Sequence, residues 1–173
     1  MWFYNITTKF FYAYFKLMYK LDVEGIENIP SNGRLIVCSN HISLLDPVLL
    51  GAVIPRKLNY MAKKELFENK ALAFLIKNLG AFPVDRDATG LSAIKTAIKV
   101  LDKDDVFAIF PQGQRVHDMD YDKAKPGIAM ISIKSKSPII PVYIDTEYKL
   151  FKKIKVKIGS VISFDEYYDI KLK

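Results

Sequence analysis

The sequence predicts an α/β fold: a single domain with a mainly parallel central sheet flanked by helices, preceded by an N-terminal amphipathic aromatic helix. Short apolar runs rich in β-branched residues alternate along the chain with longer segments of helical periodicity. This alternation is typical of parallel strands joined by right-handed helical crossovers. A chain of 173 residues, half of them hydrophobic, is large enough to bury one good core, so we expect one domain.

The first 22 residues are unusually aromatic and predict an amphipathic helix. One side carries polar and basic residues and the other apolar and aromatic ones: Asn5, Lys9, Tyr12, Lys16 and Lys20 against Phe3, Phe10, Tyr14, Leu17, Met18 and Leu21. A basic aromatic helix is typical of segments that lie in a membrane interface. An ordinary helix packed on the domain is the alternative. We expect residues 1–22 to be the membrane-interface helix and residues 23–173 the α/β domain.

The remaining elements follow from hydrophobic periodicity, with a turn-rich connection at residues 25–33. Strands are expected at residues 35–38, 58–62, 81–84, 106–110, 139–144 and 154–162, and helices at 47–54, 65–79, 89–103 and 125–135. Pro83 places the third of these strands at a sheet edge, because proline cannot donate to a central ladder.

The charge balance favours an anionic partner. The chain has 26 Lys and Arg against 19 Asp and Glu, a net charge of +7, which suits a phospholipid surface, a nucleic acid or a phosphorylated substrate. No groove-reading or base-stacking motif accompanies the charge, so a nucleic-acid partner is not expected.

Two further classes are disfavoured. Cys38 is the only cysteine, so the chain forms no internal disulfide, and no metal site is expected. The longest stretch without Asp, Glu, Lys or Arg runs from Leu35 to Leu45, shorter than the roughly 18 apolar residues of a spanning helix. We therefore expect no transmembrane helix and, because Lys9 and Lys16 interrupt the first apolar region, no secretory signal.

A histidine and a carboxylate lie between the first core strand and the next helix, in Ser39-Asn40-His41-Ile42-Ser43-Leu44-Leu45-Asp46-Pro47. Residues five apart on a straight helix are turned by about 140°, so His41 belongs to the turn before the helix. The spacing predicts Asp46 as helix N-cap and Pro47 as the first helical residue. Asp46 can then orient the His41 ring as a base; equally, it can serve only as a cap, with His41 an ordinary loop residue. The pair alone leaves both open.

Polar clusters also follow three later apolar runs. They are Lys63/Lys64, Asp85/Arg86 and Gln112 to Arg115. In a parallel sheet the carboxyl ends of the strands share one edge, so these clusters are expected to converge near His41.

Four blocks in order resemble the glycerolipid acyltransferases with a His-x4-Asp motif, best represented by 1-acyl-sn-glycerol-3-phosphate (lysophosphatidate) acyltransferases. They are Asn40 to Pro47, Gly80 to Arg86, Phe110 to Arg115, and Ile139 to Ile144. The resemblance covers about residues 23–145 and implies an enzyme of phospholipid biosynthesis. Such an enzyme moves an acyl group from acyl carrier protein or a coenzyme A thioester to a lysophospholipid hydroxyl. The resemblance implies no cofactor beyond the acyl thioester and a peripheral position on the cytoplasmic face of the membrane.

The resemblance also implies roles for single residues. His41 would be the general base, held by Asp46; Arg86 and Arg115, with Lys63 assisting, would bind the acceptor's phosphate. Gln112 and Gly113 would lie in the acceptor or oxyanion region. The third block of the family usually reads Phe-Pro-Glu-Gly-Thr-Arg, so Gln112 and Gln114 are departures. The alternative is thus a catalytically weakened, lipid-binding relative, or an acyltransferase with a different acceptor.

Overall fold

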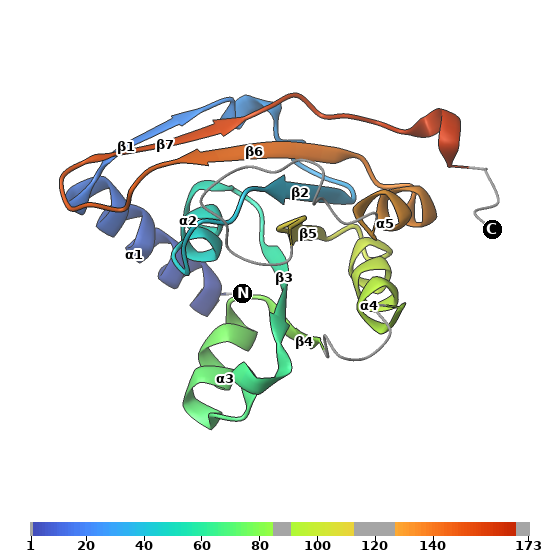
Figure 1. The fold of residues 1–173 in the computed structure, drawn as a ribbon, viewed down its shortest axis with the longest axis horizontal. Coiled ribbons are helices and arrows are strands. Elements are labelled where there is room, and N and C mark those ends of the chain that lie inside the picture. Colours follow the sequence, from blue (N-terminus) through green and yellow to red (C-terminus); the bar gives the residue numbers. More distant parts are fainter. Residues whose placement is uncertain (1, 85–90, 113–126, 169–173) are drawn as a thin grey trace.

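The computed structural model describes residues 2–84, 91–112 and 127–168. Its centre is a seven-stranded sheet in the order β1-β7-β6-β2-β5-β3-β4 (Figure 1). The strands are β1 (Lys20–Glu24), β2 (Leu35–Ser39), β3 (Leu58–Lys63), β4 (Ala81–Val84), β5 (Val106–Ile109), β6 (Ile139–Asp145) and β7 (Lys153–Ile158). All adjacent pairs are parallel except β6 and β7. The expected mainly parallel α/β sheet is confirmed, and β4, which contains Pro83, is an edge strand as predicted.

Helices cover both faces of the sheet. They are α1 (Trp2–Met18), α2 (Asp46–Val53), α3 (Lys70–Asn78), α4 (Leu91–Leu101) and α5 (Gly127–Ser135), with short 3-10 segments η1 (Ile26–Asn28), η2 (Lys64–Phe67) and η4 (Asp165–Tyr167). One core lies between the sheet and α1 and α2, and contains Phe15, Leu49 and Leu50. The other lies under α4 and α5, around Phe107, Leu101 and Ile131. The sheet is therefore covered from both sides, as continuous apolar strands require.

Three predicted elements differ from the structure. The N-terminal helix ends at Met18, and Lys20–Glu24 form strand β1 instead of the last helical turn. The helix expected at 65–79 is divided into η2 and α3, because the Asn69 side chain accepts the backbone N–H groups of Ala71 and Leu72 and so caps a new helix. The last strand, β7, ends at Ile158, and only an isolated bridge between Ile139 and Ile162 continues the pairing.

Helix α1 packs on the domain with one side and exposes the other. Tyr4 and Phe15 are buried, and the Tyr4 hydroxyl accepts the backbone N–H of Leu58 at 3.0 Å. On the outer side Trp2, Ile6, Phe10 and Leu17 are 59–74% exposed. In the described part of the chain, no helix combines the length and the apolar character that crossing a bilayer requires.

Candidate active site

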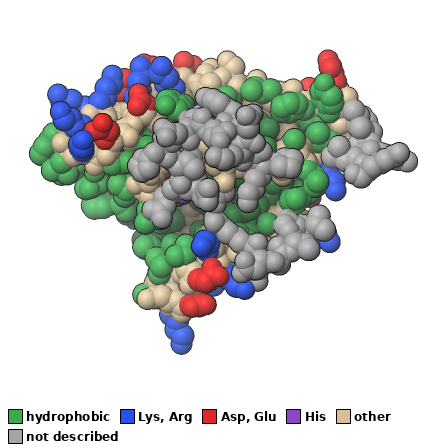
Figure 2. All heavy atoms as spheres, viewed as in Figure 1, with side chains coloured by type: hydrophobic (Ala, Val, Ile, Leu, Met, Phe, Trp, Pro, Cys, Tyr) green, Lys and Arg blue, Asp and Glu red, His purple; other side chains and the backbone are tan. Residues whose placement is uncertain are grey.

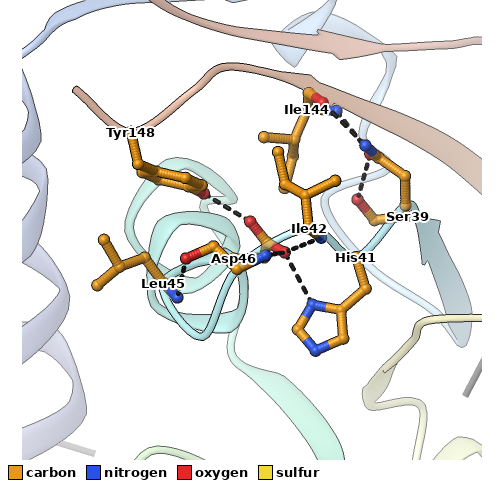
Figure 3. Close-up of polar contacts among 9 residues, drawn as sticks. Ser39, His41, Ile42, Leu45, Asp46, Ile144 and Tyr148 are labelled. Carbon is orange, nitrogen blue, oxygen red and sulfur yellow. Dashed lines mark hydrogen bonds and ion pairs between the residues drawn. The ribbon is translucent and has the colours of Figure 1, made fainter. Parts of the chain in front are cut away.

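The His-x4-Asp segment leaves the centre of the sheet at the carboxyl end of β2. Strand β2 lies between β5 and β6, and the chain passes from Ser39 through Asn40 and His41 into α2. Asn40 fixes the start of this turn: its amide donates to the Ile144 carbonyl and accepts the Ile144 N–H, both at 2.8 Å. These two bonds imitate a further step of the β2–β6 ladder, so the residue before His41 is fixed to β6 (Figure 3).

Asp46 is fully buried, and each of its carboxylate oxygens has a donor. Oδ2 accepts from His41 Nδ1 and from the backbone N–H groups of Ile42 and Ser43, each at 2.7 Å. Oδ1 accepts the Tyr148 hydroxyl at 2.6 Å. Charge-assisted bonds of this length are the strong ones, and together they satisfy a buried carboxylate that would otherwise be costly.

The predicted N-cap assignment of Asp46 is wrong. The N-cap is Leu45, and Asp46 is the first residue of α2. The carboxylate turns back toward the preceding loop because the Ile42 and Ser43 N–H groups bind it, and it caps no helical N–H. The alternative in which Asp46 serves only as a helix cap therefore does not hold. Asp46 contacts His41 directly.

The His41 ring is oriented on two sides. Because a carboxylate ligand only accepts, Nδ1 carries the proton and Nε2 of the neutral ring keeps a free lone pair. The ring stacks on Phe110, with centroids 4.2 Å apart and planes 21° apart. Its side chain is 17% exposed, and Nε2 has no hydrogen-bond partner among the described residues. The imidazole thus has a nitrogen able to accept a proton, and this nitrogen points away from Asp46 (Figure 3).

Gln112 follows β5 in the same sequence block as Phe110. Its side-chain oxygen is buried and accepts no hydrogen bond from any residue that the structure describes. A buried amide oxygen without a donor is unusual, since such atoms are nearly always paired. The atom is therefore suited to accept a hydroxyl or N–H from a bound molecule.

The other predicted site residues are placed only in part. Lys63 ends β3 and is exposed, and its side chain has no hydrogen bond or ion pair with the described residues. Arg86, Gly113 and Arg115 lie outside the described residues, so their predicted roles stay predictions. No group of His, Cys, Asp and Glu side chains able to hold a metal occurs within residues 2–84, 91–112 and 127–168.

Two contributors to the site were not singled out from the sequence. Phe110 and Tyr148 contact the His41 ring and the Asp46 carboxylate, respectively. Phe110 belongs to a recognised block, and its position at the carboxyl end of β5, next to β2, could have indicated the contact. Tyr148 lies 102 residues after Asp46 in a β6–β7 loop, and no local signal marks it.

A cavity of about 640 Å³ lies elsewhere, between α1, α2 and the amino ends of β3 and β5. In a parallel arrangement the amino ends of β3 and β5 lie at the edge opposite His41, which follows the carboxyl end of β2. Neither His41 nor Asp46 lines this cavity. The chemistry of the dyad is therefore separate from it.

Known proteins are similar to this chain in sequence and in fold. Residues 20–145 match the family model described as Acyltransferase. A Bacillus subtilis 1-acyl-sn-glycerol-3-phosphate acyltransferase is 38% identical over 142 residues, covering 80% of this chain and 70% of the relative. A Streptococcus pneumoniae protein of the same name is 40% identical over 119 residues, or 67% of this chain and 44% of its own length. The crystal structure of the 1-acyl-sn-glycerophosphate acyltransferase PlsC from Thermotoga maritima aligns with a TM-score of 0.72 at 25% identity, covering 94% of this chain and 68% of that one.

Proposed function

The chain belongs to the Acyltransferase family, and from this premise we propose that it transfers a fatty acyl group from a thioester carrier to the hydroxyl of lysophosphatidate or a related lysophospholipid. The observation that carries the proposal is the hydrogen bond of 2.7 Å between His41 Nδ1 and Asp46, which leaves Nε2 available as a base. The names of the bacterial relatives support a lysophosphatidate acceptor. Acyl carrier protein and coenzyme A are both candidate carriers.

In the proposed reaction His41 Nε2 takes the proton of the acceptor hydroxyl as its oxygen attacks the thioester carbonyl. The resulting imidazolium lies against the buried Asp46 carboxylate, which stabilises its charge. The tetrahedral intermediate collapses with cleavage of the C–S bond, and the proton on Nε2 passes to the departing thiolate. An ester and a free thiol are formed, and the substrate hydroxyl takes the place of an enzyme nucleophile.

Among residues 2–84, 91–112 and 127–168, no side chain near the dyad is a better nucleophile. Burial raises the pKa of the Cys38 thiol to about 11, so it stays protonated and weakly reactive at neutral pH. The Ser43 hydroxyl accepts the Leu45 N–H at 3.2 Å, and Ser39 is buried beside Asn40. These positions favour direct attack by the acceptor over a covalent acyl-enzyme.

The Ile42 and Ser43 N–H groups are excluded as donors to the oxyanion, because both already bind Asp46 Oδ2. The Gly113 amide and the backbone N–H groups at the start of α2 are the candidate donors that remain. Arg86, Arg115 and Lys63 are the proposed phosphate ligands, since guanidinium and ammonium groups suit a phosphomonoester.

We propose that α1 holds the enzyme on the membrane surface. On a helix Trp2, Ile6, Phe10 and Leu17 fall within an arc of about 80°, and this exposed stripe is bordered by Lys9 and Lys16. Figure 2 shows hydrophobic side chains gathered on the side of the molecule where α1 lies. An apolar stripe flanked by lysines, without a carboxylate in the helix, suits an anionic phospholipid interface.

The reaction is tested with purified protein, thioester donors and a panel of acceptors that comprises lysophosphatidate, other lysolipids and glycerol 3-phosphate, with the products measured by mass spectrometry. His41→Ala is expected to abolish acylation without unfolding the protein, since the ring is partly exposed and contributes little to either core. An unchanged rate in folded His41→Ala would overturn the assignment. Vesicle co-sedimentation of Leu17→Glu tests the membrane contact. Ala13→Glu adds the same charge on the same face but loses only a methyl group, so the difference between the two variants measures the apolar contribution of Leu17.

The Gln112 oxygen, which accepts no hydrogen bond from the described residues, supports a second candidate: a lipid-binding relative with weak turnover, or an enzyme with a different acceptor. A neutral amide oxygen accepts a weaker hydrogen bond from a hydroxyl group than a carboxylate does, and it carries no charge that would attract a cation. Gln112→Glu separates the two. A large gain in acylation supports the weakened site, whereas loss of an existing activity supports a changed acceptor.

A further inference from the structure

Tyr148 contacts the dyad from a distant part of the chain. It lies in the loop between β6 and β7, and its hydroxyl reaches the Asp46 Oδ1 atom at 2.6 Å. All three donors to Oδ2 come from the β2–α2 loop, so Tyr148 is the one side chain among the described residues that holds Asp46 from outside its own loop. Figure 3 shows the phenol and the imidazole on opposite sides of the carboxylate.

The conformation of Tyr148 is specific to this contact. Its φ of 51° lies in the left-handed region, which is uncommon for a bulky residue without a local reason. Thr146 Oγ1 accepts the Tyr148 N–H at 3.0 Å and donates to the Lys153 carbonyl at 3.3 Å, which fixes the turn. Burial, followed by the bond to Asp46, raises the pKa of the phenol, so the hydroxyl remains a donor.

We propose that Tyr148 is a positioning residue that fixes the plane of the Asp46 carboxylate and thereby sets the pH range in which His41 acts as the base. With Oδ1 held by Tyr148, Oδ2 must face the imidazole. The phenol also draws negative charge toward Oδ1, so the carboxylate stabilises an imidazolium less than a free carboxylate would. Removing the phenol is therefore expected to favour the imidazolium form of His41.

The surroundings of the contact introduce no competing charge among the described residues. The titratable groups that face Tyr148 are Asp46 of α2 and Tyr19 at the end of α1, whose ring lies 6.4 Å away at 86°. Among the described residues, the one side chain in contact with Asp46 that can carry a positive charge is His41, and it does so only when protonated. The Phe151 N–H of the same loop donates to the Met18 carbonyl at 2.8 Å, so this loop connects the end of α1 to the dyad.

The test compares Tyr148→Phe with Tyr143→Phe, an exposed tyrosine of the adjoining strand whose hydroxyl bonds no described residue. Tyr148→Phe is expected to lower kcat about tenfold, because the Asp46 carboxylate is no longer fixed in plane and orients the His41 ring less well, which outweighs the stronger imidazolium stabilisation. KM is expected to stay within about twofold, because no substrate contact is lost. In the pH profile of kcat/KM, the acid limb of this variant is expected to move to higher pH by about half a unit or more. This is less than the shift expected from removing the whole charge of Asp46. Tyr143→Phe is expected to behave as wild type.

Two results would overturn the inference: wild-type kcat in Tyr148→Phe, or a lower kcat with an unmoved acid limb, as a purely structural role predicts. If Tyr148→Phe does not fold, Thr146→Val is the second test, because this variant loosens the turn and keeps the phenol. The inference requires that Thr146→Val also moves the acid limb to higher pH. The inference rests on the proposed role of His41 as base. NMR titration of the His41 ring in wild type and Tyr148→Phe measures the same shift of protonation to higher pH without any turnover. A failure of the inference about Tyr148 can therefore be told apart from a failure of the proposed reaction.

Discussion

Replacing Asp46 by asparagine and by alanine should separate its catalytic role from its structural one. In Asp46→Asn the amide oxygen must face His41, because the Ile42 and Ser43 N–H groups repel an NH2 group at that position. The NH2 group then faces Tyr148, whose hydroxyl can accept. The Ile42, Ser43 and His41 donors keep their acceptor, and the histidine tautomer is preserved. The losses are the charge and the acceptor of the Tyr148 hydroxyl proton, and the protein is expected to remain folded.

The rate effect of Asp46→Asn follows from the ion pair that forms in the transition state. Unit charges about 4 Å apart attract by about 4 kcal/mol at an effective dielectric constant of about 20. Partial exposure of His41 reduces this to about 2–4 kcal/mol, which is a fall in kcat of about 30- to 1,000-fold. Asp46→Ala instead removes the acceptor of four donors, namely the Ile42 and Ser43 N–H groups, His41 Nδ1–H and the Tyr148 hydroxyl. The two part-buried backbone N–H groups alone cost about 1–3 kcal/mol each. We expect it to lose about 2–6 kcal/mol of unfolding free energy, much of a typical domain's stability.

The assay is product formation measured by mass spectrometry, with thermal and urea unfolding of each variant. Asp102→Asn is the control. The Asp102 carboxylate is 57% exposed, and its contact with Arg34 is a long surface ion pair of 3.7 Å. We expect it to change stability by less than about 0.5 kcal/mol. An Asp46→Asn enzyme within about threefold of the wild-type kcat would refute electrostatic support of His41. An Asp46→Ala protein as stable as wild type would refute the structural role.

Three further changes test neighbouring residues. Asn40→Ala removes both bonds to Ile144 and is expected to cost about 2–4 kcal/mol of unfolding free energy, measured by urea denaturation; an unchanged midpoint would contradict the role of Asn40. Cys38→Ala is expected to retain acylation, and the native thiol, with its pKa raised to about 11, should react with a disulfide reagent at pH 8 far more slowly than the urea-unfolded chain, because the thiolate forms only above that pKa; equal labelling rates would refute this. Phe110→Leu keeps an apolar side chain but removes the stacked ring, so kcat should fall a few-fold with stability changed by about 1 kcal/mol, and an unaltered kcat would show that the stack does not orient His41.

The central strands were predictable because their signal is local. Apolar runs at 35–38 and 106–110 form the adjacent strands β2 and β5, and that adjacency brings the blocks containing His41 and Phe110 together. The carboxyl-edge rule for parallel sheets thus predicted the meeting of two motifs 69 residues apart along the chain. Pro83 likewise predicted an edge strand, because its missing N–H excludes it from a central ladder.

Strand β1 was missed because its signal depends on a distant partner. Leu21 and Lys20 fit the helical pattern of the preceding residues, yet Lys20–Glu24 pair with β7. Asp22 and Glu24 on β1 meet Lys153 and Lys155 on β7 at 2.8 and 2.7 Å. Alternating carboxylates in one segment and alternating lysines in another are complementary only after the two segments are aligned. Helical periodicity alone therefore extended the first helix beyond Met18.

The site shows the same division between local and distant information. The spacing of His41 and Asp46 placed the histidine in the turn, but it did not show that the carboxylate binds the two peptide N–H groups between them. Because Ile42 and Ser43 bind through their backbone, the length of the intervening segment constrains the geometry more than its side chains do. Those two peptide groups and His41 Nδ1 converge on one oxygen, so the main chain itself sets the distance between the base and its carboxylate. What the main chain leaves free is Oδ1, and that oxygen is bound by Tyr148, which no spacing rule connects to the motif.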